Sequence, residues 1–225
     1  MRAKSINSKI QTIVDQLIAD GYEKIPYEYY YYKTLPAGAI PTQIEFFHQV
    51  VGQSDGSMTL TEEDTNMEKQ SDFAYPFLAQ NISHIILPSR SLEAIVQEID
   101  TAGQDYNIKK AIVNDIYKLY NSGVVKLNVQ SKELFKVSPL MRIPSGVGVS
   151  GDLSISSSKS DSSKIYVGGL LMNGEAGRNN KFPIEIMFAP NTKFTFTLQF
   201  PKGTITTYND LRIGFILEGI LFRKS

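Results

Sequence analysis

Of all features of this 225-residue sequence, a strict alternation of large apolar and small polar residues near the C-terminus limits the possible folds most strongly. From Phe194 to Phe200 every second residue is Phe or Leu, and the residues between them are Thr or Gln. A period of two places the apolar groups on one face of an extended segment, which is typical of a half-buried β-strand. Residues 184–188 and 211–217 repeat the pattern, and Pro, Asn and Asp break the chain between these segments. The sequence therefore predicts three strands here, the last of which ends at Glu218-Gly219.

Patterns of the same period elsewhere raise the expected number of strands to about eight. Strands are expected at 42–51, 77–88, 125–129, 134–137 and 165–172, with a hairpin turn at Asp55-Gly56. The Ser- and Gly-rich stretch 145–163 predicts a long exposed loop with one weak strand near residues 153–155. Since strands and helices do not alternate regularly, a parallel doubly wound sheet is not expected.

Apolar residues at helical spacing predict three helices. The first starts at Asn7 or Ser8, ends before Gly21 and carries one apolar stripe, formed by Ile10, Ile13, Val14, Leu17 and Ile18. Two further helices are expected near 91–103 and 106–121, as an insertion between strands. A lone helix ahead of a β domain can bury its stripe on its own sheet or on a neighbouring subunit, and both alternatives stay open.

A run of tyrosines follows the first helix, and it comprises Tyr29, Tyr30, Tyr31 and Tyr32. Consecutive side chains of an extended segment point to opposite faces, so some of these rings face away from the core. Such rings suit a subunit contact, a platform on which bases stack, or packing beneath a loop. Together with the five residues of the helix stripe, these tyrosines are the candidate subunit-interface residues.

Composition excludes several classes of site. With 23 basic and 23 acidic residues the formal net charge is zero, so no global field attracts nucleic acid or an anionic membrane. The absence of cysteine excludes disulfides, thiolate catalysis and cysteine metal sites. No apolar run approaches the roughly 20 residues of a transmembrane helix, and no signal peptide is recognisable, so we expect a soluble, non-exported product.

No motif points to catalysis or to a metal site. His48 and His84 are the only histidines, each lies in an expected strand, and their spacing matches no zinc motif. His48 is interpreted as a packed, hydrogen-bonded side chain. The glycines at 146–151 match G-x-G-x-x-G, but no helix is expected after them. The acidic stretch Glu62–Asp64 lacks the spaced ligands of a calcium loop and is interpreted as a solvated turn.

About eight antiparallel strands with long insertions predict a mainly β fold, namely a jelly-roll β-sandwich with an N-terminal helix and a two-helix insertion. Four stretches add a family resemblance: Asp64-Thr65-Asn66-Met67 ahead of a strand, the Asn173-Gly174 turn, Phe182–Ile186 with Asn191–Phe200, and the ending Leu211–Arg223. They resemble the jelly-roll capsid proteins of tailless bacteriophages, loosely over residues 42–223. Such phages often use a double jelly roll, whereas this chain has strands enough for one, so a shell, a vertex and another virion protein all stay open.

The resemblance implies a structural virion protein: a self-assembling capsid shell subunit with no catalytic residue, no metal and no cofactor. It implies copies of itself and other virion proteins as partners, permits weak contact with the packaged genome, and implies no small-molecule substrate. The chain would be made in the host cytoplasm and end in the capsid. Residues 1–41 would form the helix and a Tyr-rich arm, and residues 42–225 one jelly-roll domain with its helical insertion at about 91–122. The alternative is a carbohydrate- or receptor-binding jelly-roll module, lectin-like or part of a spike, whose exposed tyrosines would stack on sugar rings.

Overall fold

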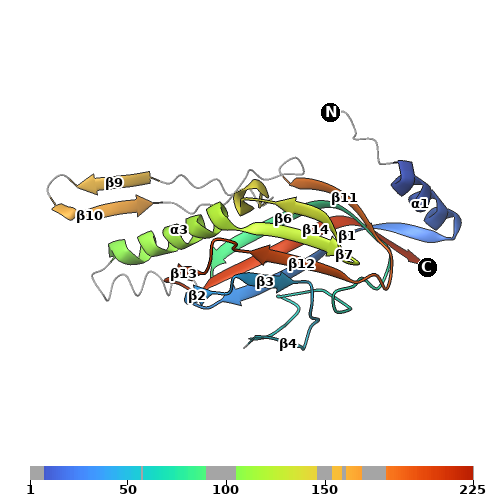
Figure 1. Ribbon diagram of the computed structural model, residues 1–225, viewed down its shortest axis with the longest axis horizontal. Coiled ribbons are helices and arrows are strands. Elements are labelled where there is room, and N and C mark those ends of the chain that lie inside the picture. The colour runs from blue at the N-terminus through green and yellow to red at the C-terminus, as the bar shows by residue number, and fades with distance from the viewer. Residues whose placement is uncertain are drawn as a thin grey trace.

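The computed structural model describes residues 8–56, 58–89, 105–145, 154–158, 161–168 and 181–224 (Figure 1). Its helices are α1 (Ser8–Ala19), α3 (Asp105–Ser122) and the short 3-10 helix η1 (Leu140–Arg142). Its strands are β1 (Tyr22–Leu35), β2 (Gly38–Ile40), β3 (Gln43–Phe46), β4 (Ser54–Asp55), β5 (Met58–Thr59), β6 (Phe77–Pro88), β7 (Val124–Val129), β8 (Lys132–Val137), β9 (Ser154–Ser158), β10 (Asp161–Gly168), β11 (Phe182–Phe188), β12 (Phe194–Gln199), β13 (Ile205–Thr207) and β14 (Leu211–Lys224). The expected mainly β class is therefore confirmed.

Two four-stranded antiparallel sheets form a sandwich. The first sheet has the strand order β1-β14-β6-β11, and the second sheet has the order β3-β12-β7-β8. Rings from the two sheets meet between them, because Phe46 and Phe196 of the second sheet each lie 4.8 Å, centroid to centroid, from Phe215 of the first. One continuous apolar core fills this layer, as in other two-sheet sandwiches.

α1 precedes β1, and the connections between these eight strands carry the other described elements. The segment 47–76 between β3 and β6 contains the small β4–β5 hairpin, and α3 lies between β6 and β7. The β9–β10 hairpin lies between β8 and β11, and in Figure 1 it runs beside α3 and extends past the sandwich. The helix expected near 91–103, the Asn173-Gly174 turn and the glycines at 146–151 lie outside the described residues.

The strand expected over residues 42–51 is wrong in its second half. β3 ends at Phe46 because Phe47 has a φ of 60°, which turns the chain away from the sheet. Phe46 and Phe47 are both buried, and the Phe47 ring lies 5.4 Å from that of Phe196. The alternation of apolar residues extends beyond β3 in the sequence because the chain after β3 also covers the core. His48 therefore lies after the strand and not within it.

The last strand does not end at Glu218-Gly219, because β14 continues to Lys224. The glycine meets a packing requirement: a Cβ on Gly219 would lie 1.9 Å from the carbonyl oxygen of Leu78. The β14–β6 register shifts at the same place, so that a residue of β6 bulges out of the ladder. A glycine that permits close approach of two strands was thus mistaken for a strand end.

The stretch 145–163 is only partly the expected loop. The weak strand near residues 153–155 is confirmed by β9, whereas residues 161–163 belong to β10, which pairs with β9 as an antiparallel hairpin. Ser-rich strands of this kind carry little apolar periodicity, so they are hard to recognise before their partner is known.

Candidate functional site: the ion-pair network at Asp55

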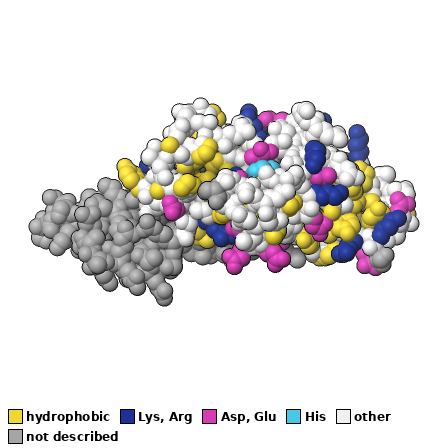
Figure 2. Space-filling view, turned by 90° about the horizontal axis from the view of Figure 1, so that it is seen from below, with side chains coloured by type: hydrophobic (Ala, Val, Ile, Leu, Met, Phe, Trp, Pro, Cys, Tyr) yellow, Lys and Arg dark blue, Asp and Glu magenta, His cyan; other side chains and the backbone are white. Residues whose placement is uncertain are grey.

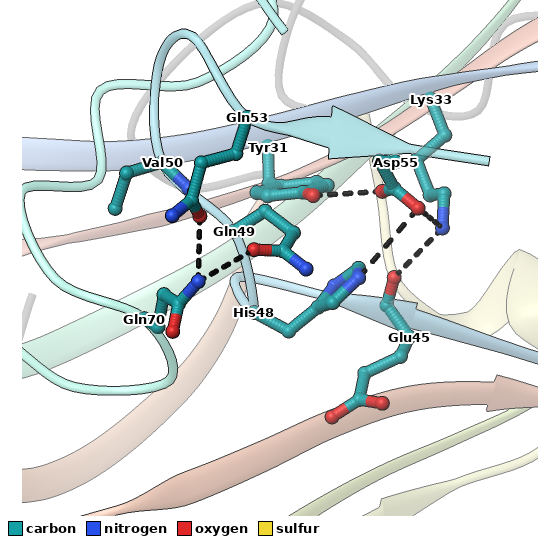
Figure 3. A network of polar contacts seen from close by, with 9 residues as sticks. All are labelled: Tyr31, Lys33, Glu45, His48, Gln49, Val50, Gln53, Asp55 and Gln70. Atoms are coloured by element: carbon teal, nitrogen blue, oxygen red, sulfur yellow. Dashed lines mark hydrogen bonds and ion pairs between the residues drawn. The ribbon is translucent and has the colours of Figure 1, made fainter. Parts of the chain in front are cut away.

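Three separate segments of the chain bring charged and polar side chains together around Asp55 (Figure 3). Asp55 ends β4 at the expected turn, where Gly56 takes a φ of 67° that glycine adopts without strain. Tyr31 and Lys33 lie two residues apart and therefore on the same face of β1. His48 follows β3. Side chains of β1 and of the residue two positions after β3 therefore meet at one carboxylate, which belongs to the β4–β5 hairpin.

The Asp55 carboxylate is the centre of the network. Tyr31 Oη donates a hydrogen bond of 2.7 Å to Oδ2, Lys33 Nζ lies 2.7 Å from Oδ1, and His48 Nε2 lies 3.6 Å from the same oxygen. Lys33 Nζ also donates to the carbonyl oxygen of Glu45 at 3.4 Å. The Asp55 side chain is 8% exposed and that of Lys33 is 17% exposed, so water screens this ion pair weakly.

These contacts determine the protonation states of the Asp55 carboxyl group and the Tyr31 hydroxyl group. Burial alone would raise the pKa of Asp55, but hydrogen bonds from His48, Lys33 and Tyr31, together with the Lys33 charge, outweigh burial and hold the pKa well below its ordinary value. Burial and the hydrogen bond to Asp55 raise the pKa of Tyr31 above its ordinary range. Neither group changes its charge near neutral pH, which a general acid or base must do. The network therefore fastens the β4–β5 hairpin to the sheet.

A pocket of about 330 Å³ lies beside the network, at the small end of ligand pockets. The Lys33–Asp55 pair is part of its wall. Much of the remaining lining is apolar and includes Leu35, Ile40, Ile44 and Met58. Lys33 and Asp55 neutralise each other, and Glu45 is the third charged residue of the lining.

A second polar cluster holds the ends of the segment 47–76 together (Figure 3). Gln70 Nε2 donates to Gln49 Oε1 at 2.8 Å and to Gln53 Oε1 at 2.7 Å. Gln53 Oε1 also accepts a hydrogen bond of 3.3 Å from the backbone N–H of Val50. The segment is thus tied to itself as well as to the sheet.

The same segment also closes part of the edge of β1. Asn66 Oδ1 accepts a hydrogen bond of 3.0 Å from the backbone N–H of Tyr30, and Asn66 Nδ2 donates one of 2.7 Å to the carbonyl oxygen of Glu28. The carbonyl oxygen of Asp64 accepts one of 2.7 Å from the N–H of Tyr32. An open edge is a template for pairing with another chain, and here one amide side chain substitutes for a neighbouring strand.

The interpretation of Glu62–Asp64 as a solvated turn is wrong for Asp64. This residue is 7% exposed, its Oδ2 accepts hydrogen bonds from the N–H and hydroxyl of Thr61, and its Oδ1 lies 3.1 Å from Arg212 Nη2. Glu62 and Glu63 are exposed, as expected. The Asp64 carboxylate can be buried because the hydrogen bonds within its own turn and the contact with an arginine of β14 replace its hydrogen bonds to water.

The expected interface residues of α1 lie on the outer face of the first sheet. Val14 is buried against Leu78 and Phe222, and Ile10 and Leu17 pack around them. These contacts bury the centre of the stripe within the chain itself, which is the first of the two alternatives left open above.

The two flanks of the same stripe remain accessible. Ile13 and Ile18 are each 45% exposed. Exposed aliphatic side chains beside a packed helix are available for contact with another molecule. A subunit contact through these two residues stays a prediction.

The four tyrosines alternate between the two faces of β1. Tyr29 and Tyr31 are buried in the core, where the Tyr29 ring lies 4.3 Å from that of Phe73. Tyr30 and Tyr32 lie half-buried on the other face. The structure therefore does not gather the nine expected interface residues into one patch.

Neighbouring groups also cover the outer pair of tyrosines. The Tyr32 ring lies against Gly214, at which a Cβ would come within 1.9 Å of the ring, and the Arg212 guanidinium stacks 5.1 Å from the Tyr32 centroid. Tyr30 Oη donates a hydrogen bond of 2.6 Å to the carbonyl oxygen of Glu62. These contacts are local packing, the third of the alternatives given above, and a subunit contact through the accessible parts of the two half-buried rings stays a prediction.

His84 is fully buried beside Tyr120 and Phe215, at ring distances of 5.3 and 5.9 Å. Burial lowers the pKa of His84 to about 3, against a smaller opposite effect from the backbone of Ile143. The imidazole is therefore neutral at physiological pH. Among the described residues, no group of three or more His, Asp and Glu side chains could hold a metal ion.

Comparisons with protein-family models, with curated proteins and with solved structures found no match for this chain. In the described parts of the chain, neither helix combines the length and the apolar character that crossing a membrane requires.

Proposed function

We propose that this chain is a jelly-roll subunit of a virion shell. The observation that supports the fold is the nested pairing of the eight strands that form the two four-stranded sheets. In chain order the first pairs with the eighth (β1–β14), the second with the seventh (β3–β12), the third with the sixth (β6–β11) and the fourth with the fifth (β7–β8). A jelly roll arises when one long antiparallel hairpin folds over into two sheets, and that process produces this nesting.

Two further features support assembly as the function. The residues that resemble phage capsid proteins include β14 and the Asp64–Met67 stretch, which lie side by side in the fold through the Arg212–Asp64 contact. Figure 2 shows basic and acidic side chains interspersed on one face, with apolar groups between them and no field of one sign. Surfaces of this mixed kind suit contacts with copies of the same chain better than contacts with a polyanion.

The accessible flanks of α1 provide the test. The Ile13→Glu/Ile18→Glu double variant places two charges on the exposed half of the stripe. Since each isoleucine is 45% exposed, covering that half by a neighbour would contribute about 1 kcal/mol per residue. The unmodified chain should elute as large particles or oligomers in size-exclusion chromatography with light scattering, and the double variant should elute as a folded monomer.

A matched control adds the same charge elsewhere on the helix. The Thr12→Glu/Gln16→Glu variant changes two exposed residues on the side of α1 that faces away from the sheet. It should assemble like the unmodified chain. Equal assembly of both variants would contradict a role for α1, and a monomeric unmodified chain, with no particles in electron microscopy, would contradict the shell function itself. The alternative, a carbohydrate- or receptor-binding module, predicts a small oligomer in the same experiment.

A further inference from the structure

The outer face of the first sheet carries a groove of about 640 Å³, and one of its lining residues, Ile220, also packs against the cluster around Val14 of α1. Its polar lining consists of Glu28, Gln80, Asn81, Lys181 and Glu218, which come from β1, β6, β14 and the residue before β11. The groove is distinct from the Asp55 network, which lies on the side of β1 that faces the segment 47–76.

A β-bulge places two amide side chains in this groove. Glu218 pairs with Asn81 and the next residue of β14 pairs with Ala79, so Gln80 has no partner on β14. Ala79 and Ile82 both belong to the core, which leaves Gln80 and Asn81 together on the outer side of the strand. Bulges occur often beside functional sites, where they redirect side chains.

The arrangement of charges in the groove includes a like-charge pair that lowers the local stability of the sheet. Glu28 and Glu218 are direct partners in the β1–β14 ladder, and like charges in this position destabilise a sheet. Lys181 Nζ forms an ion pair with Glu218 Oε1, and the two side chains are only 18% and 21% exposed. The groove thus combines one ion pair, one further carboxylate and two amides. A local conflict of this kind is expected mainly where function requires it.

We infer that this groove binds a neutral oligosaccharide. β14 and β6 each lie between two other strands of the sheet, so a peptide cannot bind here as an additional strand and the side chains that line the groove carry the recognition. Amides and carboxylates together donate to and accept from neighbouring hydroxyl groups, whereas an apolar ligand would leave them unpaired. The two glutamates oppose an anionic ligand. Pro26 and Ile220, which also line the groove, can contact the C–H face of a sugar ring.

This inference goes beyond the proposed assembly and does not depend on it. The test is saturation-transfer NMR of the full chain with millimolar maltotriose, cellotriose, lactose and N,N′-diacetylchitobiose, followed by titration of each sugar that receives saturation. At least one sugar should bind, and Gln80→Ala and Asn81→Ala should each weaken its Kd about tenfold, as expected for the loss of hydrogen bonds in a groove. Asn128→Ala and Gln199→Ala on the second sheet are the matched controls and should bind like the unmodified chain.

The Glu28→Gln variant separates binding from stability. It relieves the repulsion with Glu218, so its melting temperature should stay the same or rise, while the loss of one acceptor weakens sugar binding several-fold. Absence of saturation transfer from all four sugars, or equal binding by groove and control variants, would overturn the inference. Tighter binding of sialyllactose than of lactose would also overturn it. Size-exclusion profiles of the groove variants should remain those of the unmodified chain, so failure of sugar binding is distinguishable from failure of assembly.

Discussion

Replacing His84 by leucine should remove most of the loss of stability that the protein undergoes between pH 7 and pH 5. The His84 side chain is fully buried, and burial lowers its pKa to about 3. In the unfolded chain the same imidazole has a pKa of about 6.5. Leucine is of similar size and does not titrate, so it can occupy the space between Tyr120 and Phe215 without a charge.

The sign and size of this change in stability follow from the difference in proton binding between the folded and unfolded chains. His84 in the folded protein favours the neutral form, so its contribution to stability is complete above pH 6.5 and is lost as the pH falls toward 3. Each pH unit in this window costs up to about 1.4 kcal/mol, which amounts to about 2 kcal/mol at pH 5. The low pKa of Asp55 acts in the same direction, but only near and below the ordinary aspartate range of about 4, so it contributes little here.

Urea unfolding at pH 7, 6 and 5, followed by circular dichroism, measures the effect. The free energy of unfolding of the unmodified chain should fall by about 2 kcal/mol more than that of the His84→Leu variant. The His48→Gln variant keeps the buried histidine and should retain the loss. If the unmodified chain and His84→Leu lost equal stability between pH 7 and pH 5, the imidazole would not be held neutral in the fold, and the reasoning would be refuted.

Three further substitutions test the packing and the networks. Gly219→Ala would place a Cβ 1.9 Å from a backbone oxygen of β6 and should lower the free energy of unfolding in urea by at least about 3 kcal/mol. The control Gly203→Ala, at a position with a φ of 110° and nothing within 4 Å, should cost about 1 kcal/mol. Equal losses in the two variants would contradict the close approach of β14 and β6. Asp55→Asn leaves the Lys33 ammonium without its counter-charge and should cost about 3 kcal/mol, and an unchanged urea midpoint would show that the pair is not important for stability. Asn66→Ala exposes the edge of β1 and should cost about 1–3 kcal/mol with faster amide exchange along that strand; protected β1 amides in the variant would argue against the edge closure.

The sequence predicted those elements whose own side chains carry a period. Helix α1, helix α3 and strands such as β6 and β12 were recognised because each buries one continuous face. The three-residue strands β2 and β13 were missed, since three residues are too few to establish a period. The ends of β3 and β14 were misjudged for a different reason. Each depends on contacts with another strand, and a single sequence does not contain that information.

The Asp55 network could not be predicted for a similar reason. Its four side chains lie within 25 residues of one another in the chain, yet they meet only because β1, β3 and the β4–β5 hairpin are held side by side. The Asp55-Gly56 turn was a usable signal for the hairpin, but it contained no sign of Lys33 as a partner. The closure of the β1 edge by Asn66 likewise depends on a backbone that lies 36 residues away.

The placement of the tyrosines changes how assembly must be tested. Tyr29 and Tyr31 are part of the core, and β1 pairs with β14 along its whole length, so removal of residues 1–33 would take a strand and two buried rings from the sandwich. Such a truncated chain would unfold whether or not the N-terminus contacts other subunits. Removal of residues 1–20 deletes α1 and none of the described strands. It leaves β1 intact and uncovers only the small cluster around Leu78 and Phe222, so a folded chain that no longer assembles is the expected outcome. If this shorter chain assembled like the unmodified one, the subunit contact would lie elsewhere on the sandwich.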